Sequence, residues 1–501
     1  MSVVGLNPEG RVSATVTAVG RLWIGLVLAT SLWIDSAPIC AENVSSARSH
    51  IVVIMVDDMG YGDPGCYNAE SKIPTPNLNQ LARDGMRFTD AHAPGPLCHL
   101  SRYGLMTGRY PFRANPGQWR KKPTIAENRV TIASLLAESG YRTAMVGKWH
   151  LGFNEDGYDK PLPGGPIDRG FQSFFGIRAS TDIPPYFYLR GDRAVSPPSL
   201  NISANSSPGW SPIQGAFWRA GGIAPGLELK DVLPKFTEEA IDVIDAHAKS
   251  APQQPLMMYL AYPAPHTPWL PSPEFIDSSK ASMYGDFTVM VDAMIGKVLQ
   301  ALQKNEMDKE TLVIVTSDNG PVWYEADVNR FAHNSSGGLR GMKADAWEGG
   351  HRMPFVVRWP GVVAPASVSE QTICFTDLLA TFAAIVGVEL PQDAGPDSFD
   401  LLPVLRGQVS DDEPVRPSFV MESGNKTMTV RVGDWKLIEG LGSGGFSKPS
   451  RVKPTPGGPV GQLYNLADDP AETTNRFADL PETVARLRAE LRRVRDSGRS
   501  R

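Results

Sequence analysis

The 501-residue sequence lacks an excess of positive charge, long apolar runs and internal repeats. Its formal net charge of −5 gives no general attraction for a phosphate backbone, which argues against a nucleic-acid-binding protein. With 42% hydrophobic and 21% charged residues, the composition is that of an ordinary globular protein and excludes a disordered or membrane-embedded chain. At this length we expect a large domain and a second, smaller one.

No apolar run is long enough for a stable membrane span. The run from Leu22 to Ile34 is shorter than the ~20 residues that a spanning helix needs, and it lies between Arg21 and a small, polar stretch. This pattern predicts a secretory signal peptide over residues 1–41 and export to the periplasm or the extracellular space. An uncleaved N-terminal anchor and, through Cys40, a lipoprotein are the alternatives.

Cysteine is also scarce, with four residues at positions 40, 66, 98 and 374. If Cys40 leaves with the signal segment, three remain, and an odd number in an exported chain leaves at least one thiol unpaired. An unpaired cysteine is either reactive or a small buried apolar group. We interpret Cys66 and Cys374 as structural, which leaves Cys98 as the reactive candidate.

Apolar runs bounded by Gly, Pro or Asp alternate with segments of helical period, which is typical of a largely parallel sheet with helices on both faces. The predicted fold class is therefore α/β. The expected strands are residues 51–56, 143–146, 256–261, 312–316 and 355–358. The expected helices are residues 131–139, 284–303 and 377–386.

Two stretches differ from this pattern. Residues 179–223 are rich in Pro, Gly, Ser and aromatic residues and predict a long surface loop near the site, of the kind that selects substrates. After Gly407, short β-like stretches are separated by Gly and Pro, and the residues from Leu480 to Val494 have one apolar face of helical spacing. We therefore predict a catalytic domain over residues 49–407 and a smaller β-rich domain over residues 408–501.

Polar residues follow four of the expected strands, at the carboxyl ends where ligands bind in open α/β sheets. In chain order these are Asp57 and Asp58, then Lys148, Trp149 and His150, then His266, then Asp318 and Asn319. Four such ends, which carry acids, cations and imidazoles, predict one charged crevice at one edge of the sheet.

Part of this crevice has the chemistry of a metal site. Asp57, Asp58, Asp318 and Asn319 offer only oxygen ligands, which suit a hard cation such as Ca²⁺ or Mg²⁺ rather than Zn²⁺. Three carboxylates that converge without a cation would repel one another and raise one another's pKa values. One Asp-Asp pair after a strand would more often be a loop or a helix cap. The second cluster in the same sheet position favours a divalent metal.

Cys98 lies in a polar loop just before one or two helical turns that end at Gly108. At a helix N-terminus the backbone N–H groups favour an anion, and Arg102, one turn later, adds a positive charge. On this evidence Cys98 is either a thiolate nucleophile of lowered pKa or an inert buried thiol.

The segment around Cys98 resembles the signature of the sulfatase family, the formylglycine-dependent, arylsulfatase-like enzymes of the alkaline phosphatase superfamily. That signature reads Cys-x-Pro-Ser-Arg followed by Leu-x-Thr-Gly-Arg, and the matching residues are Cys98, Ser101, Arg102, Leu105, Thr107, Gly108 and Arg109. Further matches follow in order at residues 147–152, 265–268 and 317–320, at Lys343 with residues 347–350, and at residues 463–466 and 469–470. The resemblance therefore covers nearly the whole mature chain.

The resemblance implies hydrolysis of sulfate monoesters of aryl alcohols or carbohydrates. In this family a formylglycine-generating maturation enzyme converts the signature cysteine, so Cys98 would become formylglycine and its hydrate would be the nucleophile. Asp57, Asp58, Cys98, Asp318 and Asn319 would hold Ca²⁺, with Mg²⁺ as the alternative. The implied fold is a mixed sheet between layers of helices, with a smaller antiparallel sheet and a helix at the C-terminus.

The remaining roles come from the same resemblance. Arg102 would position the nucleophile. His266 would protonate the departing alcohol and His150 would accept the proton that releases sulfate, although these two roles could be reversed. The implied substrate-binding residues are Lys148, Lys343 and Ser180.

Leu100 departs from the family signature, which has Pro or sometimes Ala at this position. The maturation enzyme reads this segment, so an unmodified Cys98 would make the protein a module that binds sulfated glycans without cleaving them. A second alternative is a phosphonate or phosphodiester hydrolase of the same superfamily.

Overall fold

The computed structural model describes residues 49–501, which lie within one compact unit, Asn43–Arg501. The predicted signal peptide, residues 1–41, lies outside the described residues. Within residues 49–501 no helix is both long enough and apolar enough to cross a membrane.

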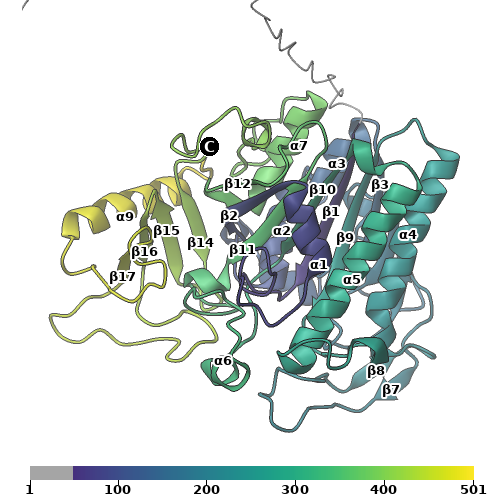
Figure 1. The fold of residues 1–501 in the computed structure, drawn as a ribbon, viewed down its shortest axis with the longest axis horizontal. Coiled ribbons are helices and arrows are strands. Elements are labelled where there is room, and N and C mark those ends of the chain that lie inside the picture. Colours follow the sequence, from purple (N-terminus) through teal and green to yellow (C-terminus); the bar gives the residue numbers. More distant parts are fainter. Residues whose placement is uncertain (1–48) are drawn as a thin grey trace, which may run out of the picture. The chain divides into compact units, whose positions relative to one another are not determined.

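An 11-stranded sheet forms the centre of the fold (Figure 1). Its strands are β1 (His50–Asp57), β2 (Met86–His92), β3 (Arg142–Lys148), β4 (Ser173–Ile177), β5 (Tyr188–Arg190), β6 (Arg193–Ala194), β9 (Leu256–Pro265), β10 (Thr311–Ser317), β11 (Arg352–Arg358), β12 (Ser367–Ser369) and β13 (Ile373–Cys374). Strands β10, β1, β9, β3 and β4 are consecutive parallel neighbours, whereas β11 pairs antiparallel with β10 and β2. The sheet is mixed and mostly parallel, as predicted.

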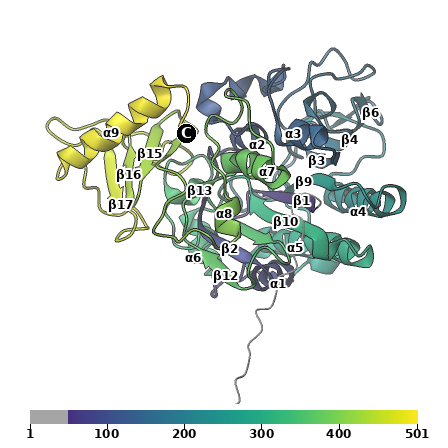
Figure 2. The ribbon, with the colours of Figure 1, turned by 90° about the horizontal axis from the view of Figure 1, so that it is seen from above.

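Helices cover both faces of this sheet (Figure 2). The helices of the described residues are α1 (Pro76–Arg83), α2 (Cys98–Thr107), α3 (Ile132–Glu138), α4 (Val232–Ser250), α5 (Ser282–Lys304), α6 (Glu325–Phe331), α7 (Leu378–Val386), α8 (Leu402–Leu405) and α9 (Pro481–Asp496). Helices α1, α4 and α5 lie on one face, and α2, α3 and α7 lie on the other. The three helices expected from the sequence correspond to α3, α5 and α7.

Strand β1 shows how the sequence produces these two layers. Its eight residues are all buried, and successive side chains point to opposite faces. Ile51, Val53 and Met55 belong to the core beneath α2, α3 and α7, while Val52 and Ile54 belong to the core beneath α4 and α5. An unbroken apolar run is therefore what a strand with both faces covered requires.

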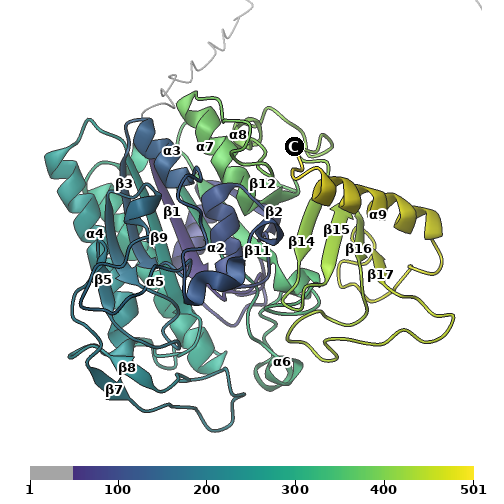
Figure 3. The same cartoon turned by 180° about the vertical axis from the view of Figure 1, so that it is seen from behind.

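A second, four-stranded sheet lies toward the C-terminus (Figure 3). Its strands are β14 (Phe419–Glu422), β15 (Met428–Val432), β16 (Trp435–Ile438) and β17 (Gln462–Asn465), each antiparallel to the next. Helix α9 lies across this sheet and buries Val484, Leu487, Leu491 and Val494 against it. The apolar face expected for this helix is confirmed, and the boundary between residues 407 and 408 stays a prediction.

A buried network of charged side chains joins the two sheets. Lys436 of β16 lies 2.8 Å from Glu348 and 2.9 Å from Glu472. Glu472 also accepts the backbone N–H of Glu348 at 2.7 Å, and Arg431 of β15 pairs with Asp90 of β2 at 2.7 Å. Because Glu348 lies in the loop just before β11, the network holds this loop against the second sheet.

Residues 179–223 contain more regular structure than the expected surface loop. Strands β5 and β6 extend the edge of the central sheet, and β7 (Leu200–Ile202) and β8 (Gly221–Ile223) form a separate two-stranded sheet. These strands have only two or three residues each and are partly exposed, so they leave no readable period of hydrophobic residues.

Candidate active site

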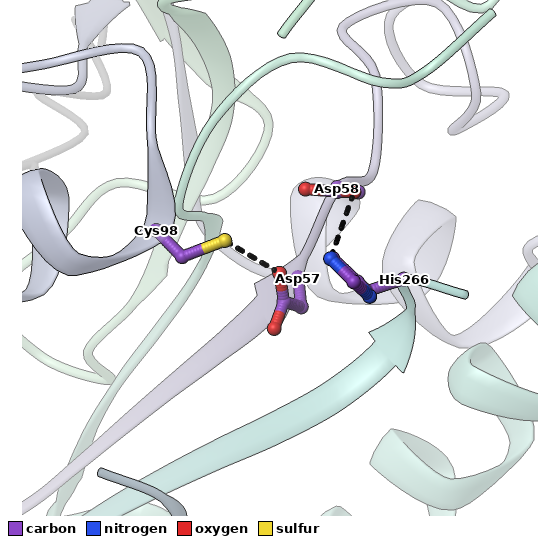
Figure 4. A group of neighbouring side chains, drawn as sticks. All are labelled: Asp57, Asp58, Cys98 and His266. Atoms are coloured by element: carbon purple, nitrogen blue, oxygen red, sulfur yellow. Dashed lines mark hydrogen bonds and ion pairs between the residues drawn. The ribbon is translucent and has the colours of Figure 1, made fainter. Parts of the chain in front are cut away.

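The nucleophile candidate Cys98 is the first residue of α2 and is buried. Its Sγ donates to Oδ1 of Asp57 at 3.2 Å and accepts a hydrogen bond from Nζ of Lys343 at 3.2 Å. Cys98 and Asp57 face each other, with Asp57 at the end of β1 (Figure 4). The helix behind the thiol is short because Gly108 ends it in a left-handed conformation, with φ 61°.

The surroundings of Cys98 do not activate an ordinary thiolate. Burial raises the pKa of the Cys98 thiol well above its usual range, and the carboxylates of Asp318 and Asp57 raise it further. Arg102, which favoured a thiolate in the sequence, instead donates from Nε and Nη2 to Oδ2 of Asp318 at 3.0 and 2.8 Å. The thiolate interpretation of Cys98 is therefore not supported.

Leu100 fits the loop that precedes Cys98. Its N–H donates to the carbonyl of Leu97 at 2.9 Å, a hydrogen bond that Pro cannot make. A Cβ at Gly95 would lie 3.0 Å from Cδ1 of Leu100, so glycine at position 95 leaves room for the leucine side chain. The chain thus accommodates leucine where the family signature has Pro.

Three carboxylates and one amide meet at the ends of β1 and β10, which are parallel neighbours. The N–H of Asp58 donates to Oδ1 of Asp318 at 3.3 Å, and Nδ2 of Asn319 donates to Oδ1 of Asp58 at 2.6 Å. Asp58 has a left-handed backbone, with φ 67°, which marks a constrained turn at the strand end. The acidic cluster expected from the sequence is present.

Three buried cations balance these three carboxylates. The ion pairs are Arg102 with Asp318, Lys148 with Asp57, and Lys343 with Asp58. Burial alone would raise the pKa of Asp57, but Lys148 and His266 hold it well below its usual range. Burial and the Asp57 carboxylate raise the pKa of Asp318. The raised pKa of Asp318 therefore reflects the repulsion between carboxylates that was expected from the sequence.

The donor atoms of this cluster fit a divalent cation. The buried Oδ1 of Asn319 has no hydrogen-bond partner within residues 49–501. Ligand atoms of Asp57, Asp58, Cys98 and His266 lie within 4.8 Å of one another. A hard cation would bind the carboxylate and amide oxygens, give Asn319 Oδ1 a partner and reduce the repulsion between the acids.

The two histidines differ in their surroundings. His266 follows β9, and its Nδ1 lies 2.6 Å from the carbonyl of Thr267, so Nδ1 carries the proton. Its Nε2 faces Oδ2 of Asp58 at 3.7 Å (Figure 4). His150 follows β3, and neither of its ring nitrogens has a partner in the described part of the chain. Burial and Lys148 lower the pKa of His150 well below its usual range, so it is neutral and can accept a proton.

A cavity of about 290 Å³ adjoins these groups. The predicted site residues that line it are Asp58, Cys98, His150, Ser180, His266 and Lys343. Two lining atoms, Oγ of Ser180 and Oδ1 of Asp182, are buried without a hydrogen-bond partner among residues 49–501. The remaining predicted residues, Asp57, Arg102, Lys148, Asp318 and Asn319, are fully buried. The structure therefore brings all the predicted site residues together, some lining the cavity and some supporting it.

The same cavity is also lined by residues that were not predicted as site residues, among them Trp119, Arg120, Asp182, Arg219 and Phe446. Trp119 packs edge-on against His150, with ring centroids 4.2 Å apart. Asp182 pairs with Arg219, and its Oδ1 lies 4.0 Å from Nδ1 of His266. For Asp182 and Arg219 the available signal was the polar and aromatic content of residues 179–223, which indicates a region and no single residue.

Comparison with known proteins agrees with this site. Residues 49–388 match the sulfatase family. The chain is 31% identical over 498 residues to an N-acetylgalactosamine-6-O-sulfatase of Bacteroides thetaiotaomicron, with 90% of this chain and 94% of that protein covered. It is 36% identical over 387 residues to human arylsulfatase A, with 73% of this chain and 70% of that protein covered.

A solved structure connected with the metabolism of multiple glycosaminoglycans by Bacteroides thetaiotaomicron has the same fold. It matches with a TM-score of 0.77 and 29% sequence identity, and the match covers 89% of this chain and 99% of that one. The shared fold, the signature around Cys98 and the sequence identity to several named sulfatases lead to one conclusion. The chain belongs to the sulfatase family and is a sulfuric ester hydrolase.

Proposed function

We propose that the protein hydrolyses sulfate monoesters of carbohydrates with a formylglycine nucleophile made from Cys98. The place of Cys98 carries this proposal: it starts α2, lines the cavity and lies 3.2 Å from both Asp57 and Lys343. An unmodified thiol is held protonated here, whereas a hydrated aldehyde supplies an oxygen nucleophile.

The proposed reaction has two steps. In the first, one hydroxyl of the hydrated aldehyde loses its proton to solvent water and attacks sulfur, the bond from sulfur to the alcohol oxygen breaks, and His266 gives that oxygen a proton. In the second, the other hydroxyl gives its proton to His150, its electrons re-form the C=O bond, and sulfate leaves. Water then rehydrates the aldehyde, His266 regains a proton from solvent and His150 releases one to it. The net reaction converts one sulfate monoester and one water into the alcohol, sulfate and one proton.

The cations and the acidic cluster support this chemistry. Lys343 lines the cavity and would neutralise the sulfate group, while Arg102 and Lys148 are buried and would position the nucleophile and balance its charge. We propose that Asp57, Asp58, Asp318, Asn319 and residue 98 hold Ca²⁺, with Mg²⁺ as the alternative. When bound, the cation would neutralise charge on the nucleophile and on sulfate.

A carbohydrate is the preferred substrate class. The Bacteroides relative is named for N-acetylgalactosamine 6-sulfate, and the unpartnered oxygens of Ser180 and Asp182 offer hydrogen bonds to the leaving group. The proposal also requires a formylglycine-generating maturation enzyme as a partner. We also propose that the protein is exported to the periplasm or the extracellular space, because residues 1–41 have the pattern of a signal peptide.

Sulfate release after co-expression with a maturation enzyme tests this function. The substrates are N-acetylgalactosamine 6-sulfate, 4-nitrophenyl sulfate and bis(4-nitrophenyl) phosphate, with Cys98→Ala as the inactive control. We expect both sulfate esters to be hydrolysed. A preference for the phosphodiester would overturn the proposal in favour of a phosphodiesterase. An unmodified Cys98 in intact-protein mass spectra, with binding but no turnover, would identify a binding module.

A further inference from the structure

A second cavity adjoins the reaction cavity. Its volume is also about 290 Å³, and Leu97 and His99 line both cavities. These two residues flank Cys98 in the sequence, so the second cavity lies beside the nucleophile across the first turn of α2. Each cavity alone is at the lower limit of the ~300–1,000 Å³ of ordinary ligand pockets, and the two together fall within that range.

Three segments form the walls of the second cavity. One is the start of α2 with Leu100, another is the stretch of residues 111–117, and the third is the turn between β14 and β15. Within this turn the N–H of Gly424 donates to the carbonyl of Ala344 at 2.8 Å, and the N–H of Ala344 donates to that of Pro96 at 2.7 Å. The second sheet is thereby tied to both the Lys343 loop and the loop before Cys98.

The walls combine apolar surface with hydrogen-bonding groups. The apolar part includes Leu100, Pro111, Phe112 and Pro116, and the polar part includes Asn115, Glu422 and Lys426. A pyranose ring presents apolar C–H faces and a rim of hydroxyls, so it matches both parts. A free anion fits less well, because the charge of Lys426 is accompanied by the carboxyl group of Glu422.

We propose that this second cavity is a subsite for the sugar unit that is linked to the sulfated sugar. The inference rests on the proposed function and narrows its substrate class from sulfated sugars in general to sulfated oligosaccharides. The sulfated unit occupies the first cavity, the glycosidic linkage passes Leu97 and His99, and the neighbouring unit lies against Phe112 and Asn115.

The first test compares substrates of increasing length. Sulfate release is measured from N-acetylgalactosamine 6-sulfate and from a di- and a tetrasaccharide in which that sugar is the sulfated unit, with 4-nitrophenyl sulfate as the reference. We expect kcat/KM to rise at least about tenfold from mono- to disaccharide, which corresponds to ~1.4 kcal/mol, and to change little for the tetrasaccharide. Equal values for mono- and disaccharide would overturn the subsite while leaving the hydrolytic function intact. Loss of all sulfate release would overturn the function itself.

A variant that fills the second cavity tests whether the preference for the disaccharide arises there. Gly117 lines the second cavity, and a Cβ placed on it meets only Oδ1 of Asn115, at 4.0 Å, so Gly117→Phe adds bulk to open space. We expect it to remove the disaccharide advantage and to leave turnover of 4-nitrophenyl sulfate unchanged. The control is Glu138→Phe, at an exposed residue of α3 that lines neither cavity.

A second variant keeps the test decisive if Gly117→Phe fails to fold. Asn115→Ala removes one polar group from an exposed position and should raise KM for the disaccharide with little change in kcat or in KM for the monosaccharide. A disaccharide advantage that persists undiminished in the folded blocking variant, or in Asn115→Ala, would contradict the proposed location.

Discussion

Asn319 donates from Nδ2 to Oδ1 of Asp58 at 2.6 Å, while its own buried Oδ1 has no hydrogen-bond partner within residues 49–501. A buried acceptor without a partner costs about 1–3 kcal/mol. The three acids beside it are paired with Arg102, Lys148 and Lys343, so Oδ1 of Asn319 is the acceptor in this cluster that a cation would satisfy. Metal binding should therefore stabilise the fold as well as support turnover.

Calcium removal tests this relationship. At a Ca²⁺ concentration of 100 times Kd, we expect a gain of about 2.7 kcal/mol in the free energy of unfolding, seen as a higher Tm that EDTA reverses. Asn319→Ala should reduce the calcium-dependent Tm shift because it removes Oδ1. Asn305→Ala is the matched control, since Asn305 also donates from Nδ2 to an aspartate, Asp245, at 2.6 Å, away from the site. A full calcium shift in Asn319→Ala would contradict the ligand assignment.

His266 should matter most for poor leaving groups. A sugar alkoxide needs a proton to leave, whereas 4-nitrophenolate leaves without one, so His266→Ala should lower kcat for the sugar sulfate by about 10²–10⁴-fold and affect 4-nitrophenyl sulfate much less. His247→Ala, at a buried histidine that binds the carbonyl of Gln254 at 2.9 Å and lines neither cavity, should change neither rate. If His150→Ala shows the selective loss instead, the two proton-transfer roles are reversed.

The parts of this molecule that follow local rules could be predicted from the sequence. The apolar run of β1 indicates a strand buried on both faces, and the polar residues after it lie at the carboxyl end where parallel strands converge. Cys98 and Arg102 could be placed because a motif and a helix start coincide there.

What could not be predicted depends on contacts between distant segments. Asp182 lies in a stretch without a hydrophobic period, and nothing local indicates that its carboxylate reaches within 4.0 Å of His266. Phe446 reaches the cavity from a glycine-rich stretch of the C-terminal part. The raised pKa of Cys98 could not be predicted either, because the carboxylates of Asp57 and Asp318 that raise it come from the ends of β1 and β10, far from Cys98 in the sequence.

The buried network between the two sheets should be a large contributor to stability. Lys436→Met leaves Glu472 buried without a cation, while Glu348 keeps its ion pair with Arg352 at 2.6 Å. This change should lower the free energy of unfolding by about 3–5 kcal/mol in urea titrations. Lys304→Met is the matched control, since Lys304 pairs with Asp245 at 3.1 Å but its side chain is 71% exposed. That change should cost less than ~1 kcal/mol. A loss in Lys436→Met no larger than in this control would contradict the importance of the network.

Glu472 should make stability depend on pH. Burial raises its pKa from 4.5 to about 7, with Lys436 opposing and Glu348 adding to the shift. The folded protein therefore keeps a proton that the unfolded chain releases above pH 4.5, so this stabilising contribution is full below pH 4.5 and is lost as the pH rises through 7. Glu472→Gln removes the titration, and the variant should lose less stability than the parent protein between pH 5 and pH 8, at up to about 1.4 kcal/mol per pH unit. Parallel curves for the two proteins would show that Glu472 is already ionised at pH 5.

A substitution at Leu100 should change the stability of the fold and the conversion of Cys98 in opposite directions. Leu100→Pro removes the hydrogen bond from the Leu100 N–H to the carbonyl of Leu97, which should lower the free energy of unfolding by about 1 kcal/mol. The same change restores the residue of the family signature in the segment that the maturation enzyme reads, so the converted fraction of Cys98 in intact-protein mass spectra should rise. His99→Ala, at the position that the signature leaves open, should not alter conversion. Equal conversion with Leu100 and with Pro would mean that the maturation enzyme reads leucine as well as proline. No conversion in either protein, together with binding of sulfated sugars, would instead favour the module that binds without cleaving.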